Sequence, residues 1–159
     1  MTAAEQEATP MPRMRHMSQR AAQHQHLPGE VFVFGSNRAG RHGKGAALDA
    51  VRLHGAVYGR GEGRQGASYA IPTKDARLQP LSLLAIEWHV AVFLEDARSQ
   101  PNTRFFVTRV GCGLAGYTDQ QIAPLFRHAP DNCRLPPGWR ELAAQPPHGF
   151  VHTLVAEDT

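Results

Sequence analysis

The sequence predicts an α/β fold, in which strands alternate with helices along the chain. Three apolar runs rich in β-branched and aromatic residues occur at 31–34, 68–72 and 104–110, with helix-forming segments between and after them. Such alternation is typical of a layered α/β domain. Glycine-rich loops follow the first and third runs. Because ligands of these folds bind at the carboxyl ends of the strands, both loops are expected at the binding edge.

Length and composition favour a single domain in a reducing compartment. The chain has 159 residues, a formal net charge of +3 and 42% hydrophobic residues, enough for one core. This mild charge, without a basic block, argues against a nucleic-acid partner. Two cysteines in no zinc or disulfide pattern indicate the cytoplasm. No apolar run reaches the roughly 18 residues of a membrane span.

The first half of the expected domain follows a tail. Residues 1–27 show no periodic pattern, so we expect a flexible tail there and a single domain over 28–159. A strand at 31–34 precedes a helix at 46–54, and the glycine-rich segment after this helix should be a loop. The second strand, 68–72, should end at its proline. Two close histidines in the tail are too few for a metal site, and no metal or cofactor is expected.

The second half begins with a long amphipathic helix. Ser82 is a suitable N-cap, and apolar residues from Leu83 to Ala97 recur on one helical face. A third strand is expected at 104–110. The second glycine loop follows this third strand directly.

A short helix should follow that loop. Thr118 and Gln121 have the spacing of a capping box, but Pro124 would interrupt a longer helix. The proline-rich segment 130–148 is expected to be irregular, and 150–155 is a candidate edge strand.

The two loops supply the candidate ligand-binding residues. Glycine turns that open helices expose backbone N–H groups, and with the helix dipole these favour an anion such as phosphate. The expected binding residues are Gly35, Ser36, Asn37, His42, Gly43, Lys44, Gly45 and Ala46 in the first loop, and Gly111, Cys112, Gly113, Leu114, Ala115, Gly116 and Tyr117 in the second.

Neither loop has the usual dinucleotide or P-loop pattern. The G-x-G-x-x-G segment 111–116 lies late in the chain, and no strand ending in an acidic residue follows it. The Gly43-Lys44-Gly45 segment continues with Ala46 and therefore lacks the hydroxyl that holds magnesium in a P-loop.

The ordered pair of loops resembles the macrodomain family over roughly residues 30–130. Asn37 precedes the 43–45 helix start by six residues, and the 111–117 loop resembles the second macrodomain loop, which wraps the diphosphate of ADP-ribose. The resemblance implies a three-layer fold with a mixed sheet between helices. It also implies that ADP-ribose, or a similar nucleotide, is the ligand. The adenine-binding aspartate of that family has only Glu30 in an equivalent place.

Within that family, the chain looks most like the terminal ADP-ribose glycohydrolase branch. Its 69–74 segment is similar to a strand of that branch, whose lysine attacks the ribose, and Lys74 matches that lysine. The position of the assisting aspartate is held by Ala115, with Asp75 and Asp119 as possible substitutes. The sequence therefore predicts binding of ADP-ribose or a related nucleotide diphosphate, with hydrolysis of an ADP-ribosyl linkage through Lys74 left open. A non-catalytic nucleotide sensor or adaptor is the alternative.

Overall fold

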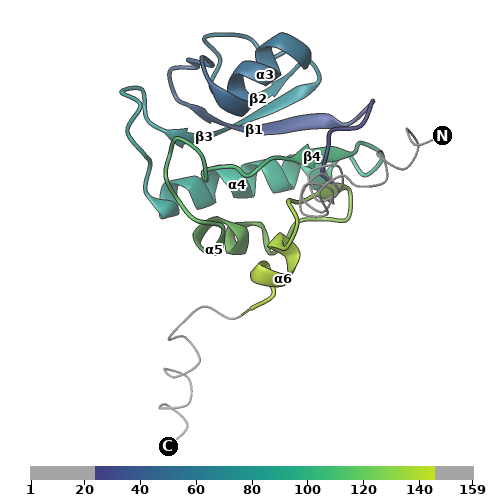
Figure 1. Cartoon of the computed structure of the whole chain (residues 1–159). Coiled ribbons are helices and arrows are strands. Elements are labelled where there is room, and N and C mark those ends of the chain that lie inside the picture. The colour runs from purple at the N-terminus through teal and green to yellow at the C-terminus, as the bar shows by residue number, and fades with distance from the viewer. Residues whose placement is uncertain (1–23, 146–159) are drawn as a thin grey trace, which may run out of the picture.

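Residues 24–145 are described by a computed structural model, which is a mixed α/β fold around one five-stranded sheet (Figure 1). The strand order is β2–β3–β1–β4–β5. The strands are β1 (Val31–Asn37), β2 (Gly63–Gln65), β3 (Ser68–Lys74), β4 (Phe105–Val107) and β5 (Cys133–Arg134).

The central strands run parallel to one another. Strand β1 pairs in parallel with both β3 and β4, and β4 pairs in parallel with β5, while β2 is antiparallel to β3. The carboxyl ends of β1, β3 and β4 therefore lie at one rim of the sheet, as Figure 1 shows. The chain segments that follow these three strands therefore all leave the sheet at this rim.

Helices pack against both faces of the sheet because residues alternate along β1. Phe32 and Phe34 pack in a small cluster with α3 (Gly45–Leu53), whereas Val31 and Val33 belong to the larger cluster on the other face. The sheet face that carries the larger cluster is covered by α4 (Leu83–Arg98), α5 (Asp119–Ile122), the 3₁₀ helix η1 (Ala123–Phe126) and α6 (Trp139–Ala143).

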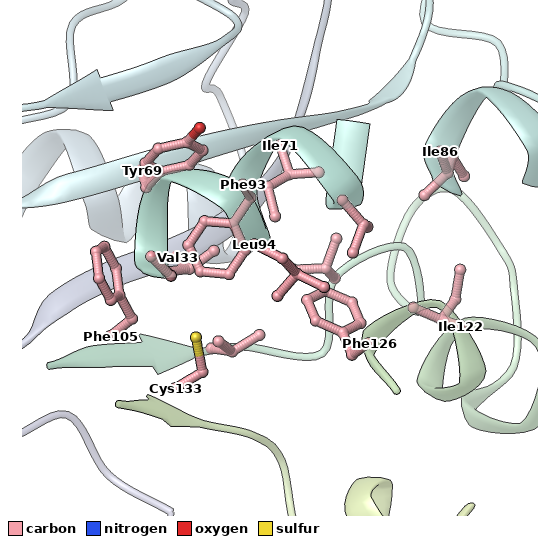
Figure 2. Packing of buried hydrophobic residues seen from close by; sticks show 14 of the residues in the cluster. Val33, Tyr69, Ile71, Ile86, Phe93, Leu94, Phe105, Ile122, Phe126 and Cys133 are labelled. Carbon is pink, nitrogen blue, oxygen red and sulfur yellow. The ribbon is translucent and has the colours of Figure 1, made fainter. Parts of the chain in front are cut away.

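The larger cluster is the main core and is shown in Figure 2. Phe93 of α4 lies edge-to-face against Tyr69 of β3 and Phe105 of β4, with ring centroids 4.9 and 5.4 Å apart. Phe126 of η1 packs beside Trp139 of α6. These aromatic contacts fix α4 against the sheet and α6 against η1.

The predicted helix starts are confirmed. The hydroxyl of Ser82 accepts a hydrogen bond from the Ala85 N–H, and Thr118 and Gln121 form the reciprocal capping box that opens α5. Pro124 lies in the 3₁₀ helix directly after α5, so the expected interruption occurs.

Several predicted boundaries were wrong. Strand β3 continues through Pro72 to Lys74, because the β1–β3 ladder has a register shift opposite Pro72 and proline is tolerated at such irregularities. The glycine-rich segment contains the short strand β2, and the third strand covers only Phe105–Val107.

Two short elements occur in the segment expected to be irregular. Strand β5 extends the parallel sheet beside β4, and α6 buries Trp139, at 1% exposure, in the main core. Elements of two and five residues are too short for a periodic pattern to reveal. The candidate strand 150–155 lies outside the described residues.

The described chain is already packed at its start. His24 stacks on Phe106 with ring centroids 4.4 Å apart, and its Nε2 lies 2.8 Å from the carbonyl oxygen of Val107. The ring centroids of His26 and His54 lie 4.3 Å apart, beside Phe32.

Within residues 24–145, no helix has the length and apolar character required to span a bilayer.

Candidate functional site

The two glycine loops line one cavity at the carboxyl rim of the sheet. Its volume is about 730 Å³, a size typical of small-molecule sites. Of the residues predicted from the sequence, the structure brings thirteen around it: Gly35, Ser36, Asn37, Gly43, Lys44, Gly45, Ala46, Lys74, Gly111, Cys112, Gly113, Leu114 and Ala115.

Two glycines show why side chains are missing here. A Cβ on Gly35, in β1, would lie 3.3 Å from the backbone nitrogen of Gly111, so this glycine lets the second loop approach the strand. A Cβ on Gly113 would meet no atom within 4 Å. The surface at Gly113 is therefore open, and a side chain there would occupy space beside the cavity rather than disturb the fold.

Both loops present backbone N–H groups that the described protein does not use. Within residues 24–145, no hydrogen bond is made by the amides of Gly45, Ala46 and Ala47 at the start of α3. The same holds, in that part of the chain, for the amides of Gly113 and Leu114 in the second loop. Amide donors at a helix start and in a glycine turn are the usual protein groups for binding an anion.

The charge of the lining points the same way. Four cationic side chains, Arg41, Lys44, Lys74 and Arg109, line the cavity, and none of the described lining residues is acidic. Arg109 is paired with Asp119, whereas Arg41, Lys44 and Lys74 form no salt bridge with any described residue. A cavity with this balance attracts an anionic ligand.

Asn37 shapes the first loop. Its side-chain Oδ1 accepts from the N–H of Arg41 and its Nδ2 donates to the Arg41 carbonyl, both at 2.9 Å. The side chain is 4% exposed. This is the local turn expected of an asparagine in such a loop. The direct role of the Asn37 side chain is therefore structural, because it holds the backbone of Arg41 and the glycines that follow.

Three predicted binding residues lie outside the lining. His42 is 1% exposed, and its Nε2 is bonded to the Arg60 carbonyl beneath the first loop. The Tyr117 hydroxyl donates to the Leu81 carbonyl at 2.5 Å, which ties the second loop to the chain before α4. Gly116 forms the turn just before Tyr117, and its N–H donates to the Gly113 carbonyl. The structure thus gives these residues supporting contacts behind the cavity.

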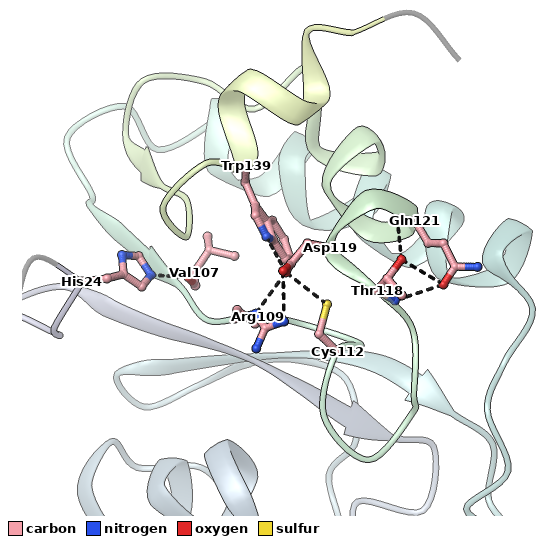
Figure 3. Close-up of polar contacts among 8 residues, drawn as sticks. All are labelled: His24, Val107, Arg109, Cys112, Thr118, Asp119, Gln121 and Trp139. Atoms are coloured by element: carbon pink, nitrogen blue, oxygen red, sulfur yellow. Dashed lines mark hydrogen bonds and ion pairs between the residues drawn. The ribbon is translucent and has the colours of Figure 1, made fainter. Parts of the chain in front are cut away.

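A polar cluster anchors the second loop to α5 and α6 (Figure 3). Asp119 accepts two hydrogen bonds from the Arg109 guanidinium, both at 3.0 Å, and one from Trp139 Nε1 at 2.9 Å. The Arg109 guanidinium, followed by the Trp139 N–H, holds the pKa of the Asp119 carboxyl below its usual value despite partial burial. Asp119, considered as a substitute acid or base, is therefore an ionised partner of Arg109 and lies outside the lining.

Cys112 joins the same cluster. Its Sγ lies 3.7 Å from the Asp119 Oδ1. Burial, together with the nearby Asp119 carboxylate, raises the pKa of the Cys112 thiol to about 11. The thiol is therefore protonated at neutral pH, and protonated thiols are poor nucleophiles.

Six lining residues were not predicted, and five of them lie within three residues of a predicted one in the sequence. Thr73 precedes Lys74 and donates to the Ser36 carbonyl, while Leu78 comes from the turn between β3 and α4, where the sequence carried no glycine signal. The six are Arg41, Ala47, Thr73, Leu78, Thr108 and Arg109.

Glu30, which the macrodomain resemblance suggested as a stand-in for an adenine-binding aspartate, does not line the cavity. It lies before the amino end of β1, is 3% exposed, and binds Arg134.

Among the described residues, no group of three or more histidine, cysteine or acidic side chains is arranged to hold a metal ion.

Comparisons with models of protein families, with curated proteins and with solved structures found no match to this chain.

Proposed function

We propose that the protein binds ADP-ribose or a related nucleotide diphosphate, with the diphosphate between the start of α3 and the second glycine loop. The observation that carries the proposal is the single cavity onto which both loops open, with unused amides on each side and Arg41, Lys44 and Lys74 around it. A diphosphate has two anionic groups and can accept hydrogen bonds from both loops at once.

A macrodomain-like relationship is part of the same proposal. Its support is the resemblance of the two loop segments, together with a mixed sheet that carries helices on both faces. We therefore propose that this α/β fold is the three-layer macrodomain arrangement. The two free thiols support the proposed cytoplasmic location.

The described lining favours the binding function over hydrolysis. Lys74 stands at the end of β3 and lines the cavity, where it can contact the ligand directly. However, glycoside hydrolysis ordinarily requires carboxyl groups, and none is found among the described lining residues. The described lining therefore fits a nucleotide sensor or adaptor, our second candidate for the biological role of this site, better than it fits a hydrolase.

Calorimetric titration with ADP-ribose tests the proposal. Gly113→Glu places a carboxylate in the open space beside the second loop, so binding should weaken at least tenfold while the protein stays folded. Gly113→Gln is the matched control, because it adds nearly the same bulk without charge and should weaken binding less. Absence of saturable binding by the wild-type protein would refute the proposal.

A turnover assay separates enzyme from sensor. The wild type and Lys74→Ala are incubated with an ADP-ribosylated protein, and released ADP-ribose is measured. Release by the wild type that is lost in Lys74→Ala, with binding retained, identifies a chemical role for the lysine. Binding without release supports the sensor.

A further inference from the structure

The turn between β3 and α4 holds a leucine in a conformation that normally requires glycine. Leu78 has φ +66°, the one positive φ at a non-glycine position in residues 24–145. The N–H of Leu78 donates to the Asp75 carbonyl, and the N–H of Asp75 donates to the Gln79 carbonyl. This is a three-residue hairpin loop, whose last position is left-handed and is usually glycine.

The turn itself is firmly fixed. The Asp75 Oδ1 accepts hydrogen bonds from the N–H groups of Arg77 and Gln79, at 2.8 and 2.9 Å. Lys74 and Pro80 form an isolated antiparallel bridge across its base. These hydrogen bonds hold the backbone of Leu78 in the left-handed conformation.

Leu78 is strained and yet only partly buried. A side chain in the left-handed region crowds the following carbonyl oxygen, which glycine and, in part, asparagine avoid. Leu78 remains 38% exposed and lines the cavity. A strained residue whose side chain faces a binding cavity is a candidate for a functional contact.

Leu114 adds a second exposed apolar side chain to the same cavity. It belongs to the second glycine loop and is 66% exposed. The rest of the lining includes five glycines, three alanines, four cationic residues and three hydroxyl residues, of which the glycine amides and the cations suit a phosphate. We propose that Leu78 and Leu114 form an apolar contact for the ring-bearing part of the ligand, and so select a nucleotide with a base over a bare diphosphate.

This inference rests on the proposed function, since the same cavity holds both parts of the ligand. The occupant we commit to is a flat heteroaromatic ring, because its faces are apolar enough to lie against leucine while its edge reaches water. Inorganic diphosphate shares the anionic part and has no ring, which makes it the appropriate comparison.

Three variants test the apolar contact by calorimetry with ADP-ribose. Leu78→Gly removes the side chain and relaxes the backbone, so the melting temperature should stay equal or rise by a few degrees while the Kd rises about fivefold or more. Leu78→Asn keeps a residue that tolerates the turn and should weaken binding similarly. Leu114→Ala should do the same, whereas Leu84→Ala, at a 77% exposed position of α4 outside the cavity, should not.

The outcomes distinguish this inference from the proposed function. If Leu78→Gly and Leu114→Ala bind ADP-ribose as tightly as the wild type, the apolar contact is refuted and the binding site stands. If Leu78→Asn restores wild-type affinity, the leucine acts only through loop shape, which also refutes it. Displacement of ADP-ribose by diphosphate at equal concentration would overturn the selection for a base, while a need for tenfold more supports it. No binding of ADP-ribose by the wild type overturns both proposals.

Discussion

Replacing Glu30 with glutamine should destabilise the protein strongly at neutral pH. Glu30 lies before β1 with 3% exposure, and its carboxylate accepts from Arg134 Nε at 2.7 Å, Arg134 Nη2 at 2.9 Å and the Leu27 N–H at 2.8 Å. Glutamine has nearly the same shape, but it removes the charge and turns an NH₂ group towards a donor. The Glu30→Gln change therefore tests the electrostatic part of this contact.

The expected loss can be estimated from these contacts. Breaking a fully buried ion pair costs about 3–5 kcal/mol, and a hydrogen bond to a charged group contributes about 1.5–3 kcal/mol. The Arg134 side chain is 32% exposed, so water partly solvates it after the change. We expect the free energy of unfolding to fall by about 2–3 kcal/mol at pH 7, measured by urea denaturation. Glu141→Gln, at an exposed position of α6, is the matched control and should change it by less than about 0.5 kcal/mol.

The pH dependence of this loss has a definite sign. Burial alone would raise the pKa of Glu30, but the hydrogen bonds from Arg134 and the Leu27 N–H outweigh it and hold the pKa below its usual value. A lowered folded-state pKa stabilises the protein above the unfolded value, about 4.3, and this contribution disappears as pH falls through the folded pKa. The difference between wild type and Glu30→Gln should therefore shrink below pH ~4. An equal difference at pH 7 and pH 3 would refute the electrostatic explanation.

Three further changes test the surroundings of the cavity. Gly40→Ala should lower the free energy of unfolding by more than about 2 kcal/mol, measured in urea, because Gly40 has φ +72° and its Cβ would lie 2.3 Å from the carbonyl carbon of Gly59; a neutral effect would contradict this packing. Asp119→Ala should cost about 1–3 kcal/mol by the same measurement, since it leaves the buried Trp139 N–H without its acceptor, and Asp119→Asn should cost less. Cys112, with a thiol pKa of about 11, should react with a thiol reagent at pH 7.5 roughly 100-fold more slowly in the native protein than in urea, and comparable rates would refute the burial argument.

The location of the cavity could be predicted because it depends on few features. Each glycine loop follows an apolar strand, and β1 and β4 prove to be adjacent and parallel, so both loops leave the sheet at one rim. The neighbouring Lys74 was predicted from β3, which is also parallel to β1. Strand direction alone therefore brings these segments together.

Side-chain orientation could not be predicted in the same way. His42 and Tyr117 belong to the two loops, yet both point into the protein, because hydrogen bonds to the distant carbonyls of Arg60 and Leu81 fix them. A loop has no regular period from which to infer which side chains face outward. Leu78 was missed for a related reason, since a leucine gives no sequence signal for a left-handed turn.

The residues that face away from the cavity account for its preformed shape. Behind the second loop, the Tyr117 hydroxyl bonds to Leu81, and Arg109 binds Asp119 with two hydrogen bonds. The backbone at Gly111 is so close to Ile122 of α5 that an added Cβ would lie 3.0 Å from its Cδ1. These contacts fix the loop from the core side and leave the amides of Gly113 and Leu114 directed to no described partner. An anion entering the cavity would therefore meet donors that are already ordered, and little conformational entropy would be lost on binding.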